Sequence, residues 1–214
     1  MVRLLAPDSA AARVQRRVHV RRGRPRDGLL QVVVQGHRLH VGVPRRVRSA
    51  CGGEGLVKGA STIFTYDPGV STGWVLGVVD GDDVEIVEYD QFTSPSHTDT
   101  AFTLKGAIWC YKPDVVVGER FDLRPHNQFL ADLTPVKVNA IMDYIYDKRP
   151  IVYQTPTQAK TLVRDATLKA LGFWPTGRSV DQPDADDVRD AARHLYHYCA
   201  MTLRLKGLLE RMAR

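Results

Sequence analysis

Four acidic residues stand where a fold could bring their carboxylates together. Asp67 ends the apolar stretch Ile63-Phe-Thr-Tyr-Asp67, and Glu119 ends Asp114-Val-Val-Val-Gly-Glu119, so each closes a predicted buried strand. Asp184 and Asp187 are three residues apart at the start of a predicted helix and therefore share one helical face. A buried carboxylate is costly without a compensating charge, so the pattern indicates a cation among these side chains.

The ligand chemistry favours magnesium or manganese. All four acids are hard oxygen donors, and no His or Cys set accompanies them, which argues against zinc. Two such ions about 3.5–4 Å apart can activate water and stabilise the leaving oxygen in phosphodiester hydrolysis. Asp190 lies one step further along the same helical face, whereas Asp186 points elsewhere. Taken singly, these acids have plainer explanations, namely a turn or an acidic first helical turn that complements the helix dipole.

The elements that must position these acids predict an α/β fold with one five-stranded mixed sheet flanked by helices. Three strands form an antiparallel meander, and two parallel strands then alternate with helices. The expected strands cover residues 62–67, 73–79, 84–92, 114–119 and 151–154. The expected helices cover residues 98–111, 127–147, a stretch opened by Thr155-Pro-Thr157, and 184–211. If the first and fourth strands are parallel neighbours, Asp67 and Glu119 end on the same side of the sheet.

Four motifs, taken in order, resemble those of the RuvC-type Holliday-junction resolvases. They are Asp67-Pro-Gly-x-Ser-Thr-Gly73, Val115-Val-Val-Gly-Glu119-Arg120-Phe121, Thr155-Pro-Thr-Gln-Ala-Lys160 and Pro183-Asp184-Ala-Asp-Asp187-x-x-Asp-Ala191. The similarity covers about residues 61–202. It implies the RNase H-like fold and a homodimeric, Mg²⁺-dependent endonuclease, in which Mn²⁺ can substitute. Such an enzyme nicks two opposing strands of a four-way DNA junction.

The resemblance also implies roles for individual residues. By motif match, Asp67, Glu119, Asp184 and Asp187 are the metal-binding catalytic acids. Lys160 matches a basic residue of the family and would contact DNA near the scissile phosphate. A second basic contact is not assigned by the motifs, and Arg164 and Lys169 are its candidates.

The segment after Glu119 departs from the family pattern. The family places an aromatic residue shortly after the matched Glu and uses it at the junction centre, and here Phe121 follows two residues later. The loop of residues 122–127 also differs from the family pattern. We expect Arg120, Phe121 and Arg124 to contact DNA, although the departure puts junction distortion and sequence preference in question.

The predicted helix 127–147 has more apolar positions than one buried face requires. They are Phe129, Leu130, Leu133, Val136, Val138, Ile141 and Ile145. Part of this helix is therefore expected to bury a dimer interface, and a two-fold dimer would suit a two-fold junction.

Charge divides the chain into two parts. Residues 1–56 contain 12 Arg, no Lys and three acids, whereas residues 57–214 contain 18 basic and 21 acidic residues, so the net charge of +6 divides into +9 and −3. The first part is either a cationic arm that grips phosphates or a stretch translated from upstream of the natural start. Gly52-Gly-Glu-Gly55 is what a purine-rich ribosome-binding site would encode, and Val57 follows at a spacing that suits a GUG start. We expect the nuclease domain to be residues 57–214.

Composition narrows the cellular setting. No apolar run approaches the roughly 18 residues needed to span a bilayer, and no signal peptide is evident. Cys51, Cys110 and Cys199 are scattered, which favours free thiols in a reducing cytoplasm. The expected location is the cytoplasm of a bacterium or a phage-infected cell, and the unusual loops favour a phage member.

Two other functions are kept as alternatives. An RNase H-like nuclease acting on RNA precursors, similar to the YqgF-like proteins, would share the first-strand Asp and the architecture. A non-catalytic module that binds branched DNA would share the basic contacts, but it would gain nothing from four acids facing phosphates.

Several conspicuous residues are given structural roles. His194 and His197 are interpreted as surface or packing residues, and Trp74, Trp109 and Trp174 as packing residues. Gly69 and Gly73 either let a phosphate backbone come close to the metals or simply shape a turn.

Overall fold

The computed structural model describes part of the chain: residues 60–121, 132–146, 150–176 and 185–213, and the backbone of residues 29–34 and 37–42. The chain forms two compact units, Met1–Val43 and Pro44–Arg214. In the first unit, β1 (Leu29–Val34) and β2 (His37–Gly42) pair with each other in an antiparallel ladder. The predicted boundary at residues 56 and 57 lies outside the described residues.

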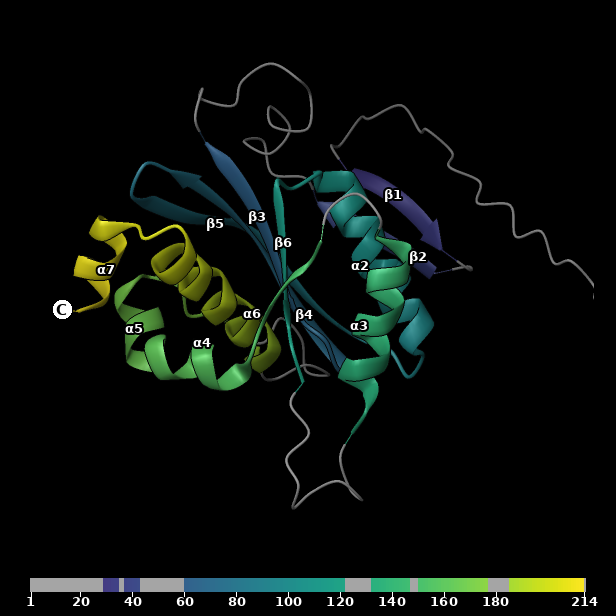
Figure 1. The fold of residues 1–214 in the computed structure, drawn as a ribbon. Coiled ribbons are helices and arrows are strands. Elements are labelled where there is room, and N and C mark those ends of the chain that lie inside the picture. Colours follow the sequence, from purple (N-terminus) through teal and green to yellow (C-terminus); the bar gives the residue numbers. More distant parts are fainter. Residues whose placement is uncertain are drawn as a thin grey trace, which may run out of the picture. The chain divides into compact units, whose positions relative to one another are not determined.

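The second unit is built on a five-stranded mixed sheet (Figure 1). Its strands are β3 (Ser61–Asp67), β4 (Ser71–Asp80), β5 (Asp83–Thr93), β6 (Val115–Glu119) and β7 (Val152–Gln154). The spatial order is β5-β4-β3-β6-β7, with antiparallel pairing from β3 to β5 and parallel pairing from β3 to β7. These strand directions and this order are those of the RNase H-like fold, so the predicted fold class is confirmed.

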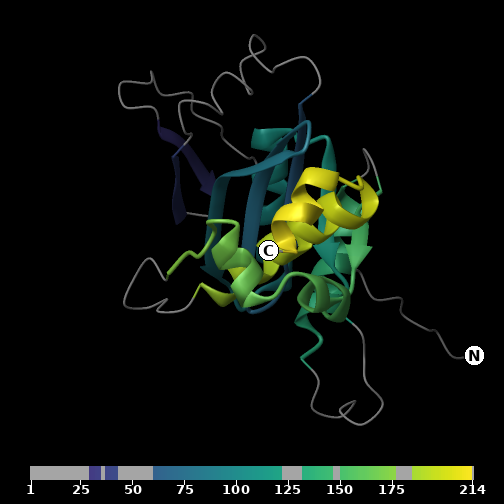
Figure 2. The same cartoon turned by 90° about the vertical axis from the view of Figure 1, so that its left-hand side faces the viewer.

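Helices cover both faces of this sheet (Figures 1 and 2). On one face lie α2 (His97–Tyr111) and α3 (Thr134–Ile145), and on the other lie α4 (Pro156–Leu162), α5 (Asp165–Ala170), α6 (Asp186–His197) and α7 (Lys206–Met212). Alternation along β3 produces the two cores, because successive strand residues point to opposite faces. Phe64 stacks on Trp74 at 5.2 Å between ring centroids, whereas Ile63 packs with the buried face of α6.

Helix α6 lies against β4 at two glycines. A Cβ atom on Gly73 would come within 2.2 Å of the main chain of Asp187, and one on Gly77 would come within 2.6 Å of the Leu195 side chain. Thr65 of β3 adds a buried hydrogen bond, donating from Oγ1 to the carbonyl oxygen of Ala191 at 2.6 Å. Gly73 therefore makes room for a helix backbone and not for a phosphate, which corrects one of its two predicted roles.

The C-terminal region differs from the single predicted helix 184–211. Helix α6 is followed by a π-helical turn (η2, Tyr198–Thr202), and α7 begins only at Lys206. Arg204 between them adopts φ 59°, a left-handed conformation that no helix interior allows. The turn lets α7 place Leu208 in the core, fully buried. The short helix α5 was also not predicted, and within the described ranges no helix is long and apolar enough to cross a membrane.

Candidate metal and phosphodiester site

Two predicted acids lie at adjacent strand ends. Strands β3 and β6 are parallel, with Tyr66 opposite Gly118, so the next residues, Asp67 and Glu119, leave the same edge of the sheet. The amide of Asn139 on α3 donates to the backbone carbonyl of Glu119 at 2.7 Å and fixes the end of β6. Both acids are half-buried.

Helix α6 brings two more acids to this edge. Asp187 lies in its first turn, beside Gly73, and Asp190 follows one turn later. Burial raises the pKa of Asp187, a hydrogen bond from Ser71 opposes that rise, and the charges of Asp190, Asp186 and Glu119 add to it. The close packing of α6 on β4 is therefore what delivers Asp187 to the strand ends.

The negative charges of the other three acids disfavour the ionised form of Asp67. Burial raises the pKa of Asp67 well above its ordinary value, and the charges of Glu119, Asp190 and Asp187 raise it further. The ammonium group of Lys160 opposes this rise. A carboxylate whose charge is disfavoured by three others is in a suitable position for a divalent cation.

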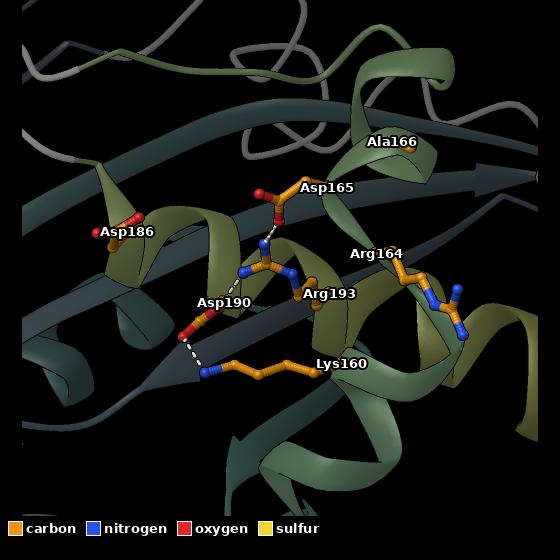
Figure 3. Close-up of a pocket in the computed structure, with 7 residues that line it drawn as sticks. All are labelled: Lys160, Arg164, Asp165, Ala166, Asp186, Asp190 and Arg193. Carbon is orange, nitrogen blue, oxygen red and sulfur yellow. Dashed lines mark hydrogen bonds and ion pairs between the residues drawn. The ribbon is translucent and has the colours of Figure 1, made fainter.

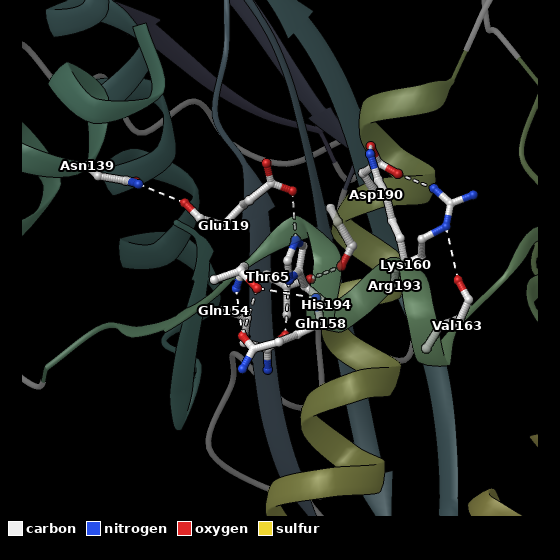
Figure 4. A network of polar contacts seen from close by, with 12 residues as sticks. Thr65, Glu119, Asn139, Gln154, Gln158, Lys160, Val163, Asp190, Arg193 and His194 are labelled. Atoms are coloured by element: carbon white, nitrogen blue, oxygen red, sulfur yellow. Dashed lines mark hydrogen bonds and ion pairs between the residues drawn. The ribbon is translucent and has the colours of Figure 1, made fainter. Parts of the chain in front are cut away.

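Basic side chains form ion pairs with the acids at this edge (Figures 3 and 4). Lys160 of α4 lies with its Nζ 2.8 Å from Asp190 Oδ2, and Arg193 of α6 forms ion pairs with Asp190 and Asp165. The buried Arg193 also donates from Nε to the carbonyl of Val163 at 3.2 Å. These contacts hold α4 and α6 together beside the acids.

An open surface cavity of about 640 Å³ lies next to this ion-pair cluster (Figure 3). It is lined by Lys160, Arg164, Asp165, Ala166, Asp186, Asp190 and Arg193. Arg164 reaches this cavity, whereas the other candidate for a second basic contact, Lys169, places its Nζ 4.2 Å from the ring centroid of Trp174. Of the two candidates, Arg164 is therefore the one that lines the cavity.

A buried histidine reaches the same site from within the core (Figure 4). His194 Nε2 lies 2.9 Å from Glu119 Oε2, and His194 Nδ1 lies 3.0 Å from the side-chain oxygen of Gln154 on β7. The interpretation of His194 as a surface or packing residue is incomplete, because both ring nitrogens contact polar side chains.

The remaining predicted site residues are placed only in part. Asp184 and Arg124 lie outside the described residues. Arg120 is exposed directly after β6, and its backbone N–H donates to the Gln154 carbonyl at 2.7 Å. Phe121, the last described residue of that segment, is half-buried. Asp186 forms an ion pair with Arg189 one turn later on α6.

The acids at the ends of β3 and β6 and on α6 are the candidate donors for a metal ion. Within the described ranges, no three His, Cys, Asp or Glu side chains are arranged to hold a metal ion as they stand. Two of the acids are already engaged, Glu119 with His194 and Asp190 with Lys160 and Arg193. The chemistry nevertheless fits, since carboxylate oxygens are the ligands of Mg²⁺ and Mn²⁺ and the repulsion at Asp67 is what a divalent ion would relieve.

Two residues of the candidate site, Asp190 and His194, were not among the predicted site residues. Both follow Asp187 at helical spacing, by three and seven residues, which places them on the face that carries the acids. That spacing was visible, but the contact of His194 with Glu119 required the parallel register of β6 and β7, with Glu119 opposite Gln154.

The fold and site define the class of protein: an α/β chain of the RNase H-like fold with acids at the ends of β3 and β6 and on α6. No protein-family model matches the chain, and no curated protein matches it. Among solved structures, it is similar to Thermus thermophilus RuvC at 17% identity and TM-score 0.47, covering 66% of this chain and 96% of RuvC. It is also similar to the Fowlpox virus resolvase solved with Holliday junction DNA, at 13% identity and TM-score 0.46, covering 65% of this chain and 99% of the resolvase.

Proposed function

We propose that the chain is a divalent-metal-dependent endonuclease that nicks opposing strands of four-way DNA junctions. The observation that carries this proposal is the convergence of carboxylates from β3, β6 and α6, in which three neighbours raise the pKa of Asp67 beyond the effect of burial. A structural role does not explain such mutual repulsion, because like charges at one edge destabilise the fold. The motif resemblance to junction resolvases indicates the four-way DNA junction as the substrate.

The acids proposed to hold the metal ions are Asp67, Glu119, Asp187 and Asp190. When bound, two Mg²⁺ ions would supply an activated water and stabilisation of the leaving oxygen. Asp190 would exchange its contacts with Lys160 and Arg193 for the metal, which frees Lys160 for a phosphate. The motif match gives Asp184 as the fourth acid, and Asp184 lies outside the described residues, so the choice between Asp184 and Asp190 is left to experiment.

DNA would be held by basic groups that flank the acids. Lys160 and Arg164 line the cavity beside Asp190, and Arg120 is exposed at the end of β6. Phe121 and Arg124 are proposed to complete this contact from the segment that follows. A sugar–phosphate backbone crossing this region would meet cations on both sides of the acids, which offsets the repulsion between phosphates and carboxylates.

The decisive test measures cleavage by the full chain and by residues 57–214, which we propose are sufficient for activity. Labelled four-way junction, flap, linear duplex and RNA are each incubated with Mg²⁺, Mn²⁺ or EDTA. Symmetric, metal-dependent nicking of the junction is expected from both proteins. Cleavage of RNA would favour the alternative function on RNA precursors. Metal-independent junction binding without cleavage would favour the binding module, and activity in the full chain alone would make residues 1–56 a working part.

The same assay distinguishes whether Asp190 or Asp184 binds the metal ion together with Asp187. Asp190→Asn is expected to lower the nicking rate on the order of 10²–10³-fold, the range for losing one group that stabilises transition-state charge. Asp184→Asn serves as the matched substitution and is expected to change the rate less than tenfold. The opposite ranking would restore Asp184 as the metal ligand and reduce Asp190 to a partner of Lys160.

We propose that the enzyme is a homodimer joined through α2 and α3. These neighbouring helices leave apolar side chains exposed, with Trp109 63% exposed, Phe102 47% and Tyr144 88%. The exposure of Trp109 corrects its predicted packing role. Trp109 lies on α2 with most of its indole exposed, so a partner subunit could cover it there.

Trp109→Glu is expected to weaken the dimer at least about 30-fold, the effect of losing a central Trp from an interface. Sedimentation equilibrium measures the change. Met201→Glu is the matched control, because Met201 is 55% exposed on η2, on the opposite side of the sheet, and should leave the dimer intact. A dimer unaffected by Trp109→Glu would place the interface elsewhere.

A further inference from the structure

One buried side chain at the site has no role in the proposed metal chemistry. His194 of α6 is 1% exposed, and it lies one turn beyond Asp190. Its ring bridges the ends of two strands, with Glu119 of β6 at Nε2 and Gln154 of β7 at Nδ1 (Figure 4). These two contacts of His194 join α6, β6 and β7 beside the acids.

The geometry fixes which atom carries the proton toward Glu119. A carboxylate oxygen can only accept, so Nε2 of His194 donates to Glu119 Oε2 across the 2.9 Å contact. The Gln154 amide can serve Nδ1 in each ring state, since its oxygen accepts from a protonated nitrogen and its NH₂ group, after rotation, donates to a bare one. Gln154 is thus compatible with an Nε2–H donor toward Glu119 in either state of Nδ1.

Glu119 is held from two sides as a result. Its backbone carbonyl accepts from the Asn139 amide at 2.7 Å, and its side chain is held by His194. The Glu119 side chain lies at the C-terminal end of β6, with only 12% of it exposed. One carboxylate oxygen is occupied by the imidazole, which leaves the other for a metal ion.

We propose that His194 is a positioning residue that presents Glu119 to the metal ion through the Nε2–H donor. This inference rests on the proposed function for its metal ion, and it goes further by assigning a role to a group that is not itself a ligand. Partners of metal ligands commonly change metal affinity or activity about 10–100-fold when removed. The loss is expected in metal affinity and turnover, with junction binding unchanged.

The test compares wild type, His194→Leu, His194→Gln and the neighbouring control His197→Gln, all as full chains. Mn²⁺ binding without DNA is measured by electron paramagnetic resonance, nicking is measured against Mg²⁺ concentration, and junction affinity is measured in EDTA. His194→Leu is expected to lose 10–100-fold in Mn²⁺ affinity and in kcat, whereas His194→Gln, which retains an N–H donor, recovers most of both. Junction affinity should stay within twofold in every variant.

A folded His194→Leu protein with wild-type Mn²⁺ affinity would overturn the proposal. If that variant does not fold, imidazole ¹⁵N spectra of the wild type decide: the Nε2 resonance of His194 should shift on adding Mg²⁺, and an unchanged resonance contradicts the role. Mn²⁺ binding that depends on His194 without any nicking would refute the proposed endonuclease and leave the positioning role standing. Metal-dependent nicking that is unchanged in the His194 variants would support the endonuclease and refute the positioning role.

Discussion

Replacing Asp67 by Asn is expected to abolish nicking and, in the absence of metal, to make the protein more stable. The first effect follows from losing a proposed metal ligand at the end of β3, and it should reach on the order of 10²–10³-fold or more. The second follows from the repulsion that Asp67 experiences. Burial and the charges of Glu119, Asp190 and Asp187 raise its pKa, so its charged form is unfavourable in the folded chain.

The sign of the pH dependence follows from that raised pKa. Folding holds the Asp67 proton more tightly than the unfolded chain does, so this stabilisation is fully present below the unfolded pKa of about 4. It is lost as pH rises through the folded pKa, and above that pH the charged group weakens the fold. Asn carries no charge, so the variant should match wild type near pH 4 and become increasingly more stable than wild type as pH rises from there.

Thermal unfolding in EDTA from pH 4 to pH 8 measures this difference. Each kcal/mol corresponds to about 2–4 °C in Tm for a domain of this size. Mg²⁺ should raise the Tm of wild type more than that of the variant, because a ligand stabilises the form that binds it. Asp80→Asn, at the exposed end of β4, is the matched control and should change neither property. A variant less stable than wild type at pH 7 in EDTA would contradict the proposed charge cluster.

Replacing Gly73 by Ala is expected to destabilise the fold by roughly 3 kcal/mol or more. The added Cβ atom would lie 2.2 Å from the carbonyl carbon of Asp187 and 2.4 Å from the backbone N of Val188. No side-chain rotation relieves a clash with main-chain atoms, so α6 must move away from β4. Because α6 carries Asp187 and Asp190, nicking should fall even under conditions where the variant remains folded.

Urea unfolding compares the midpoints of wild type, Gly73→Ala and Gly106→Ala. Gly106 lies inside α2 with nothing within 4 Å of an added Cβ atom, and Ala there should stabilise the helix by about 0.5–1 kcal/mol. Changes of opposite sign in the free energy of unfolding for these two Gly→Ala substitutions would confirm that Gly73 is needed for the close approach of α6 to β4, and not for backbone flexibility. Equal midpoints for all three proteins would show that α6 can shift without loss.

Local patterns were sufficient to predict the sheet. Alternation and turn residues predicted five strands whose observed ends differ by no more than two residues, and the meander followed by crossovers predicted β6 as the parallel neighbour of β3. Both signals are local: strand periodicity lies within a single strand, and crossover handedness involves only elements that follow one another in the chain. The juxtaposition of Asp67 and Glu119 followed directly from them.

The contents of the site depended on longer-range contacts. Helical spacing marked Asp190 as a neighbour of Asp187, but only the packing of α4 on α6 brings Lys160 to it. His194 looked like an ordinary histidine because its partners Glu119 and Gln154 are 75 and 40 residues away. The break after α6 was missed because Leu203 and Leu205 continue an apolar pattern through the left-handed Arg204.

The contact between α6 and β4 at Gly73 also bears on how the site responds to heat. Side-chain packing loosens gradually as temperature rises, and acids positioned by long side chains would drift apart with it. Here the height of Asp187 above the sheet is set by main-chain atoms of α6 resting on a residue without a side chain. The spacing of the acids is therefore preserved until the helix itself detaches, so warming should leave the site intact up to the temperature of cooperative unfolding.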